Sequence, residues 1–193
     1  NISLDHVKFL GENEEQIAAE KAGIIKPEIP VVIGETQEGS KDVFIKTAKE
    51  KNSPIFFADK IMDCRKDNTY SLDYQQFDIY KNNESYLKEL KYPLLGNYQK
   101  KNLATVICAL DILRDSFKIE EKHIIDGLAN VIKNTSLMGR WQVINKNPLA
   151  IADTGHNVAG INEVNRQLAE TKYNKLHFVL SVVNDKDIDG ILQ

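Results

Sequence analysis

Residues 1–27 read NISLDHVKFLGENEEQIAAEKAGIIKP, and this stretch decides how the first part of the chain folds. Its short apolar opening ends in a polar tip, which predicts a strand that carries His6 at its end. A helix is predicted over residues 14–25, because the glutamates in its earlier part suit the positive end of a helix dipole. Pro27 cannot continue a helix and therefore ends it.

A lysine lies on the apolar face of this predicted helix. Ile17, Lys21 and Ile25 are spaced four residues apart, so they share one face. Because the isoleucines should face the core, Lys21 is expected to point inward, where unpaired lysines are rare. Two alternatives stay open. Lys21 extends its ammonium to the edge of the sheet, or it is chemically altered or paired at a site near His6.

The same stretch resembles a known family. LDHVKFLG (residues 4–11) followed by EEQIAAEKAGIIKPEIPVVIG (residues 14–34) is similar to folylpolyglutamate synthase/dihydrofolate synthase, of the Mur ligase superfamily. The resemblance implies that His6 binds a magnesium ion and that Lys21 is carbamylated and helps to hold the same ion, with Lys26 structural. A carbamate offers the anionic oxygens that hard cations prefer, and Mn²⁺ could replace Mg²⁺.

Composition limits the class of protein. A chain of 193 residues holds one large domain or two small ones, and its net charge of −3 gives no basic surface for nucleic acid. No apolar run approaches the length of a membrane span. Cys64 and Cys108 show no motif spacing and indicate reduced thiols, so we expect a cytoplasmic protein. We also expect a monomer. The chain runs from Asn1 to Gln193, and we interpret it as a piece of a longer protein.

Alternating strands and helices follow the first helix. Strands are predicted at residues 30–33 and 54–57 around a helix at 42–51, which favours a parallel sheet covered by helices. The loop at residues 34–41 has the position of a phosphate-binding loop. Its serine and lysine are in the reverse of the Walker order, and its glutamates would repel phosphate, so we expect it not to bind nucleotide.

The sequence pattern changes over residues 61–95. Tyrosines and other apolar residues recur there near period two and are separated by an Asn-Asn turn. This pattern predicts an antiparallel β-meander added to the edge of the sheet. We expect its tyrosines to serve packing rather than chemistry.

A long helix is predicted after Gly96, with an apolar stripe that begins at Leu103. Its start, YPLLGNYQKKNLATVICAL, resembles the family motif G-x-H-Q-x-x-N-x-x-x-A, whose asparagine contacts the ATP adenine. The matching residues are Asn102 and Gln99, whereas Tyr98 replaces the usual histidine. The alternative is that Asn102 simply faces solvent.

A second helix is predicted over residues 120–133, with His123 on its surface. We place a hinge at residues 134–136 and a domain boundary after residue 135. By resemblance, residues 1–135 are the carboxyl-terminal portion of a central ATPase domain of P-loop type, a parallel sheet with helices and the meander. Residues 136–193 are the start of a Rossmann-like C-terminal domain, and the whole is of the α/β class.

Residues 138–142 read MGRWQ and resemble the family motif P-G-R-W, whose arginine binds the ATP phosphates. The resemblance assigns this role to Arg140. An isolated Arg-Trp pair is more often a surface cation–π contact, which is the alternative.

A strand at residues 149–153 ends in Asp153 and is followed by a glycine-bearing turn and a helix at residues 158–170. Ligands bind at the carboxyl end of a strand in such an arrangement. The turn resembles the family motif D-G-A-H-N, which implies that Asp153 meets the ribose and that His156 lies near the transferred phosphate. Alternatively, both residues only order the turn. A further strand is predicted at residues 176–183, and residues 185–187 resemble a helix-capping D-K-D loop.

Together the motifs imply ATP-dependent ligation of L-glutamate to folate or dihydropteroate through an acyl phosphate. Lys21 and His156 would serve the chemistry, and Asn102, Arg140 and Asp153 would bind ATP between two domains that close on it. No Walker loop occurs in these residues, so we expect this piece alone to be inactive. The alternatives are a related Mur ligase of cell-wall peptide synthesis and a non-catalytic nucleotide-binding module.

Overall fold

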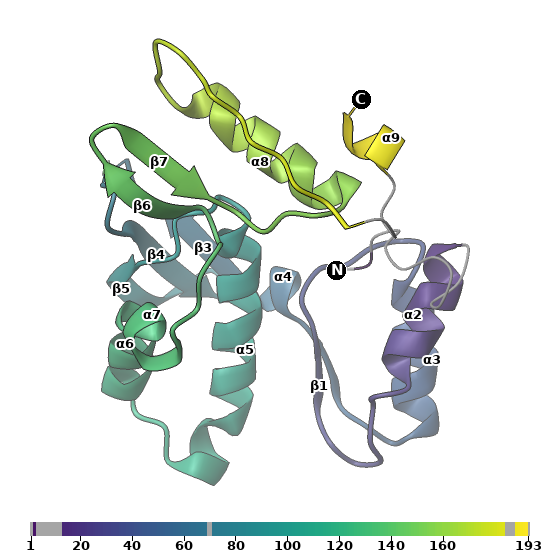
Figure 1. Cartoon of the computed structure of the whole chain (residues 1–193). Coiled ribbons are helices and arrows are strands. Elements are labelled where there is room, and N and C mark those ends of the chain that lie inside the picture. The colour runs from purple at the N-terminus through teal and green to yellow at the C-terminus, as the bar shows by residue number, and fades with distance from the viewer. Residues whose placement is uncertain (1, 3–12, 69–70, 184–187, 193) are drawn as a thin grey trace.

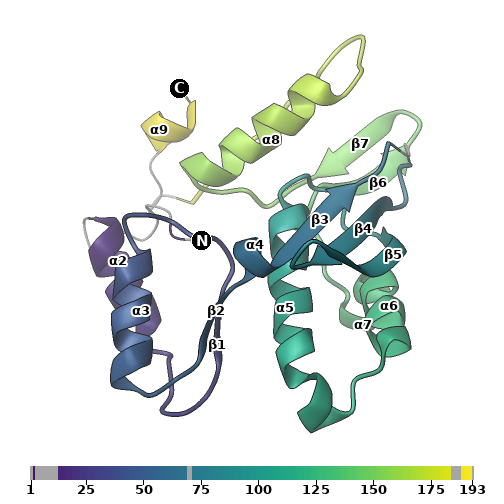
Figure 2. The same ribbon diagram turned by 180° about the vertical axis from the view of Figure 1, so that it is seen from behind.

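The computed structural model describes residue 2 and residues 13–68, 71–183 and 188–192. The chain begins with a small parallel unit made of α2 (Glu14–Ala22), β1 (Val31–Ile33), α3 (Lys41–Glu50) and β2 (Ile55–Phe57). β1 and β2 pair in parallel, with Val31 opposite Ile55. Figures 1 and 2 show α2 and α3 side by side next to these two strands.

The first helix is shorter than the sequence predicts. Asn13 caps it, because its Oδ1 accepts the backbone N–H of Gln16 at 2.9 Å, and Gly23 is the C-cap. The buried face consists of Ile17, Ala18 and Ala22, which pack in one core cluster with Ile2, Ile25 and Phe44.

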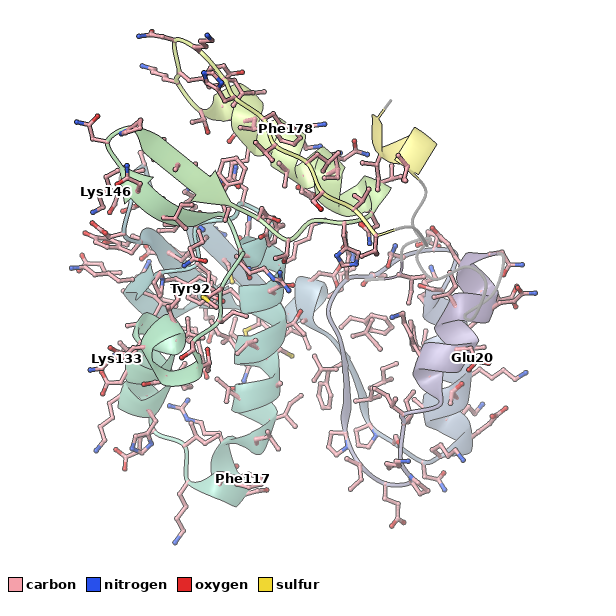
Figure 3. The ribbon with its side chains drawn as sticks, in the orientation of Figure 1. Glu20, Tyr92, Phe117, Lys133, Lys146 and Phe178 are labelled. Atoms are coloured by element: carbon pink, nitrogen blue, oxygen red, sulfur yellow. The ribbon has the colours of Figure 1, made fainter. Side chains whose placement is uncertain are left out.

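The expectation that Lys21 points inward is wrong, since its side chain is exposed. Lys21 lies in the last turn of α2, where its flexible stem can carry the ammonium into water. Burying that charge without a partner would be costly. Figure 3 shows the neighbouring Glu20 on the outer side of the same helix.

The middle of the chain is an antiparallel meander packed on helices. β3 (Met62–Lys66), β4 (Gln75–Lys81) and β5 (Glu84–Tyr92) pair in the order β3-β4-β5, as the alternating pattern predicts. The long α5 (Gln99–Phe117) and the shorter α6 (Glu121–Ala129) cover this sheet. Tyr92 points into the space between the sheet and the helices, where its ring meets Phe77 edge to face at 6.4 Å.

Two details of this region differ from the predictions. Among the described strands, the meander forms a sheet of its own and does not extend β1–β2, because the short α4 (Ala58–Ile61) redirects the chain after β2. The predicted helix at residues 120–133 is divided into α6 and α7 (Val131–Thr135), since Asn130 turns its amide back to Asp126 O at 2.9 Å. His123 lies on the surface as expected, and its Nδ1 accepts the backbone N–H of Glu120 at 3.1 Å.

The last part of the chain begins with a hairpin of β6 (Gln142–Lys146) and β7 (Leu149–Ala152). α8 (Val158–Glu170) follows with the predicted bounds, and α9 (Ile188–Leu192) is a single short turn. The mixed α/β fold class is confirmed. Among the described residues, no helix combines the length and the apolar character that a membrane crossing requires.

The strand predicted at residues 176–183 is wrong. The segment is extended, but it is paired with none of the described strands, and a strand needs the N–H and C=O groups of a neighbour. None of its apolar side chains is buried, and that of Phe178 is exposed, as Figure 3 shows. The D-K-D loop predicted at residues 185–187 lies outside the described residues.

Candidate functional site

One polar cavity brings together most of the predicted site residues. It has a volume of about 400 Å³, and Asn102, Arg140, Asp153 and His156 all line it. The connection from β7 to α8 passes across the amino-terminal end of α5 in both Figure 1 and Figure 2, which explains why residues so distant in sequence meet. The lining also includes Gly34, Glu35, Tyr98, Lys101, Thr105 and Thr154.

Asp153, directly after β7, accepts three hydrogen bonds in the cavity. Its Oδ2 accepts the hydroxyl of Tyr98 at 2.8 Å and the backbone N–H of Trp141 at 2.7 Å. Its Oδ1 accepts the backbone N–H of Gly155 at 2.8 Å. The carboxylate is thus held in one orientation by three donors, two of which come from outside its own turn.

Arg140 is aimed at the cavity by an unusual turn. Gly139 and Trp141 on either side of it have φ angles of 69° and 49°, in the left-handed region. A Cβ on Gly139 would collide with Cγ2 of Thr154, so only glycine fits there. The guanidinium donates to Gly139 O at 3.2 Å and to Thr154 Oγ1. Arg140 is therefore a fixed positive charge on the wall of the cavity, not a loose surface side chain.

The amino terminus of α8 adds a second positive feature. Asn157 caps this helix, because its Oδ1 accepts the backbone N–H of Gly160 at 2.8 Å. A Cβ on Gly155 would lie 3.3 Å from the carbonyl carbon of Gly160, so the turn packs closely on the first turn of the helix. His156 lies 3.0 Å through Nδ1 from Thr154 O, which requires a proton on that nitrogen because a carbonyl only accepts. The partial positive charge of the helix end thus faces the cavity beside Arg140.

The first turn of α5 forms another wall. Asn102 is exposed, which agrees with the alternative that it faces solvent, but its exposed side chain lines the cavity. Its Nδ2 donates to Oε1 of Gln99 at 2.9 Å, and Gln99 is itself buried. This buried partner fixes the asparagine amide in one orientation.

Sequence reasoning missed the contribution of the loop after β1. Gly34 and Glu35 line the cavity, and a Cβ on Gly34 would lie 2.5 Å from Thr105 Oγ1 of α5. Glu35 accepts the ammonium of Lys101 at 2.9 Å. The signal in the sequence was a glycine directly after a buried strand. The other end of the loop does not reach the cavity, and Lys41 pairs there with Glu38 at 2.6 Å.

Of the two predicted metal ligands, only Lys21 can be placed relative to this cavity. His6 lies outside the described residues, and Lys21 is exposed on α2 and is not part of the cavity lining. Within the described part of the chain, no three His, Cys, Asp or Glu side chains gather as a metal centre would require. The described residues alone therefore do not form a complete metal site.

Fold and site together define a class: a mixed α/β protein with a ligand cavity where a strand ends and a helix begins. Comparison with known proteins shows which proteins the chain is similar to. The chain is 33% identical over 200 residues to the probable dihydrofolate synthetase of Schizosaccharomyces pombe, and 29% identical over 194 residues to the dihydrofolate synthase/folylpolyglutamate synthase of Escherichia coli K12. Both alignments cover 100% of this chain, but only 45% and 42% of those relatives.

Solved structures of proteins with related names are also similar to the chain. A structure of E. coli FolC in complex with DHPP and ADP matches 99% of this chain with a TM-score of 0.80 at 28% identity, and the match covers 42% of that protein. An FPGS-AMPPCP-folate complex matches 90% of this chain with a TM-score of 0.78, again at 28% identity, over 41% of that protein. No family model matches the chain. The resemblance to the folylpolyglutamate synthase/dihydrofolate synthase family is confirmed, and the chain spans less than half the length of these relatives.

Proposed function

We propose that this chain is part of an ATP-dependent ligase that joins L-glutamate to folate or dihydropteroate. The single observation that carries the proposal is the convergence of Asn102, Arg140, Asp153 and His156 on one cavity. These are the four residues that the family motifs assign to nucleotide and phosphate. Support also comes from the relatives, which are named as folate-glutamate ligases, and from their structures with AMPPCP, ADP and folate.

Each residue has a role that its surroundings suit. Asn102 would bind the adenine and Asp153 the ribose, since both are held in one orientation by neighbouring groups. Arg140 would bind the phosphates together with the amino terminus of α8. His156 would lie near the phosphate that is transferred, at the start of that helix.

The proposed reaction has two steps. A carboxylate oxygen of the folate or dihydropteroate substrate attacks the γ-phosphorus of ATP, and ADP leaves as the acyl phosphate forms. The amine of L-glutamate then attacks the acyl carbon, phosphate leaves, and the amine loses a proton as the amide forms. The contribution of the described residues is to orient ATP and to stabilise the charge on its phosphates.

We also propose that Mg²⁺, which Mn²⁺ could replace, accompanies ATP and neutralises phosphate charge. His6 and Lys21, the latter as a carbamate, would supply ligands, and the exposure of Lys21 leaves its amine accessible to carbon dioxide. Electron density for a carbamate on Lys21 in the full-length protein would test this assignment.

The domain boundary after residue 135 remains a proposal. Ser136 ends α7 in a left-handed conformation with φ 55°, and both core clusters end before it. We further propose a cytoplasmic monomer without nucleic-acid or membrane partners. The negative net charge and the two free, buried cysteines support this proposal.

The test is an assay of the natural full-length gene product with ATP, L-glutamate and either dihydropteroate or tetrahydrofolate. We expect ADP release that requires both glutamate and the pteridine substrate, and a product heavier by one glutamyl residue. Turnover only with a cell-wall nucleotide peptide, or no turnover at all, would contradict the proposal. The 193-residue chain alone is expected to be inactive, and ATP-dependent glutamylation by it would refute that expectation.

A further inference from the structure

Tyr98 joins two parts of the cavity that are far apart in sequence. It is the residue directly before α5, and its hydroxyl donates to Oδ2 of Asp153 at 2.8 Å. Asp153 in turn fixes the turn that leads into α8 through its bond to Gly155. The phenol therefore connects the start of α5 to the connection between β7 and α8.

The tyrosine ring is itself held in place. A Cβ on Gly96 would lie 2.6 Å from both Cε1 and Cζ of Tyr98, so the ring lies directly over the backbone of a residue without a side chain. Burial raises the pKa of Tyr98 well above its ordinary value, and the hydrogen bond to Asp153 raises it further. The hydroxyl thus keeps its proton and stays a donor at neutral pH.

The bonds of Asp153 determine what remains for a ligand. A carboxylate offers about four acceptor positions, two on each oxygen. Tyr98 and the N–H of Trp141 occupy both positions of Oδ2, whereas Oδ1 accepts, among the described residues, only the N–H of Gly155. Acceptor capacity for one further hydroxyl group therefore remains on Oδ1.

We propose that Tyr98 is a positioning residue that sets the affinity for ATP, by saturating Oδ2 of Asp153 so that Oδ1 receives the ribose. The inference rests on the proposed function for the identity of the ligand. The tyrosine takes the place of the histidine of the family motif, so the residue type at this position adjusts how firmly α5 and the β7–α8 connection are joined. Without the hydroxyl, the carboxylate keeps the backbone N–H donors of Trp141 and Gly155 but loses one of its three hydrogen bonds. It is then held less firmly, and part of the affinity for ATP is lost to ordering it.

The chain offers a matched control. The hydroxyl of Tyr86 donates to Oδ1 of Asp111 at 3.0 Å, the same phenol–carboxylate bond. It links β5 to α5, away from the cavity, and neither residue lines it. Tyr86→Phe therefore removes the same kind of hydrogen bond as Tyr98→Phe, but outside the proposed nucleotide site.

The experiment measures AMPPCP affinity by calorimetry, and the KM for ATP and kcat, in the full-length protein. We expect Tyr98→Phe to weaken AMPPCP about tenfold, the loss of about one hydrogen bond, and to raise the KM for ATP similarly while kcat changes less than twofold. Tyr86→Phe should lower the melting temperature but leave AMPPCP affinity unchanged. Tyr98→His keeps a donor near Asp153 and should restore most of the affinity.

Unchanged affinity in Tyr98→Phe, equal weakening in Tyr86→Phe, or no AMPPCP binding by the parent protein would overturn the inference. If Tyr98→Phe does not fold, Tyr98→His is the deciding variant. A tenfold weaker affinity of Tyr98→His for AMPPCP would also overturn the inference. The proposed function can be disproved independently of this inference. A protein that binds AMPPCP with this pattern but does not attach glutamate would disprove the ligase and support the role of Tyr98.

Discussion

The parts of the chain before and after Ser136 are held together in different ways. The described residues before Ser136 contain two clusters of buried apolar side chains, of which the larger joins the meander to α5 and α6. Residues 136–192 bury single apolar side chains, such as Trp141 and Ile161, but among the described residues none of them belongs to either cluster. Apolar burial therefore stabilises the first part far more than the second.

The second part is joined to the first mainly by polar bonds. Asn97 donates its backbone N–H to Gln167 Oε1 at 2.7 Å and its Nδ2 to Glu170 Oε2 at 2.8 Å. Gln167 also donates to Leu95 O at 2.8 Å. Such bonds can be exchanged for water at small net cost, whereas a close-packed core cannot open without unfolding. Residues of both parts line the cavity, and such a position suits a site that closes on its ligand.

The largest expected effect comes from breaking the better-packed part. Leu103 of α5 is fully buried, so Leu103→Ala should lower the free energy of unfolding by about 2–5 kcal/mol. Ile161→Ala in α8 should cost less than half of that amount, because Ile161 is buried outside both core clusters, whereas Leu103 lies within the larger one. Urea unfolding of both variants measures the difference, and equal losses would contradict the comparison.

A functional substitution at the joint should have the next largest effect. Arg140→Ala removes a fixed positive charge from the cavity wall and should lower kcat/KM for ATP about 100-fold, as loss of a preorganised donor does. Arg65→Ala is the matched control, because Arg65 pairs with Asp63 on β3 and does not line the cavity. A similar loss of activity in both variants would show that Arg140 has no special role.

Removing a buried polar bond of the joint should loosen the second part alone. Gln167→Ala leaves Leu95 O and the N–H of Asn97 without their partner and should cost about 1–3 kcal/mol. We expect faster hydrogen exchange in α8 and unchanged exchange in β3–β5. Faster exchange across the whole chain would mean that the two parts unfold as one unit.

Alkaline pH should lower the stability of the well-packed first part of the chain. Burial raises the pKa of Tyr92 to about 12, against an unfolded value near 10. The folded state therefore holds this proton more tightly, so the associated stability is complete below about pH 10 and is lost as the pH rises through about 12. Tyr92→Phe should reduce the loss of stability between these pH values by about 1–2 kcal/mol. Denaturant titrations at pH 9 and pH 11.5 provide the measurement, and an unchanged loss would contradict the assignment.

The smallest effect is expected for the exposed ion pair of the joint. Lys146 at the end of the β6–β7 hairpin lies 2.8 Å from Asp73 Oδ1, and both side chains are exposed. Lys146→Ala should change stability by less than about 1 kcal/mol, since water and salt screen such pairs. A cost equal to that of Gln167→Ala would show that exposed charges contribute to the joint as much as the buried amide does.

The same contrast explains what the sequence could predict. Helix α8 was predicted with its bounds, because its capping asparagine and apolar spacing are local signals. Four residues of the cavity, Asn102, Arg140, Asp153 and His156, were predicted from motifs that place them at strand and helix ends, whereas Gly34 and Glu35 were not. The strand at residues 176–183 was not formed, because strand formation depends on a partner and not on the segment alone. The bond from Tyr98 to Asp153 spans 55 residues, and no local pattern indicates it.

The central claim is that nucleotide binds at the joint between the two parts. Hydrogen exchange of the full-length protein with and without AMPPCP tests it most directly. We predict slower exchange with AMPPCP in residues 98–105, 139–142 and 153–160, which contain the groups that line the cavity. If AMPPCP binds while exchange in all three segments stays unchanged, the nucleotide lies elsewhere and the claim is wrong.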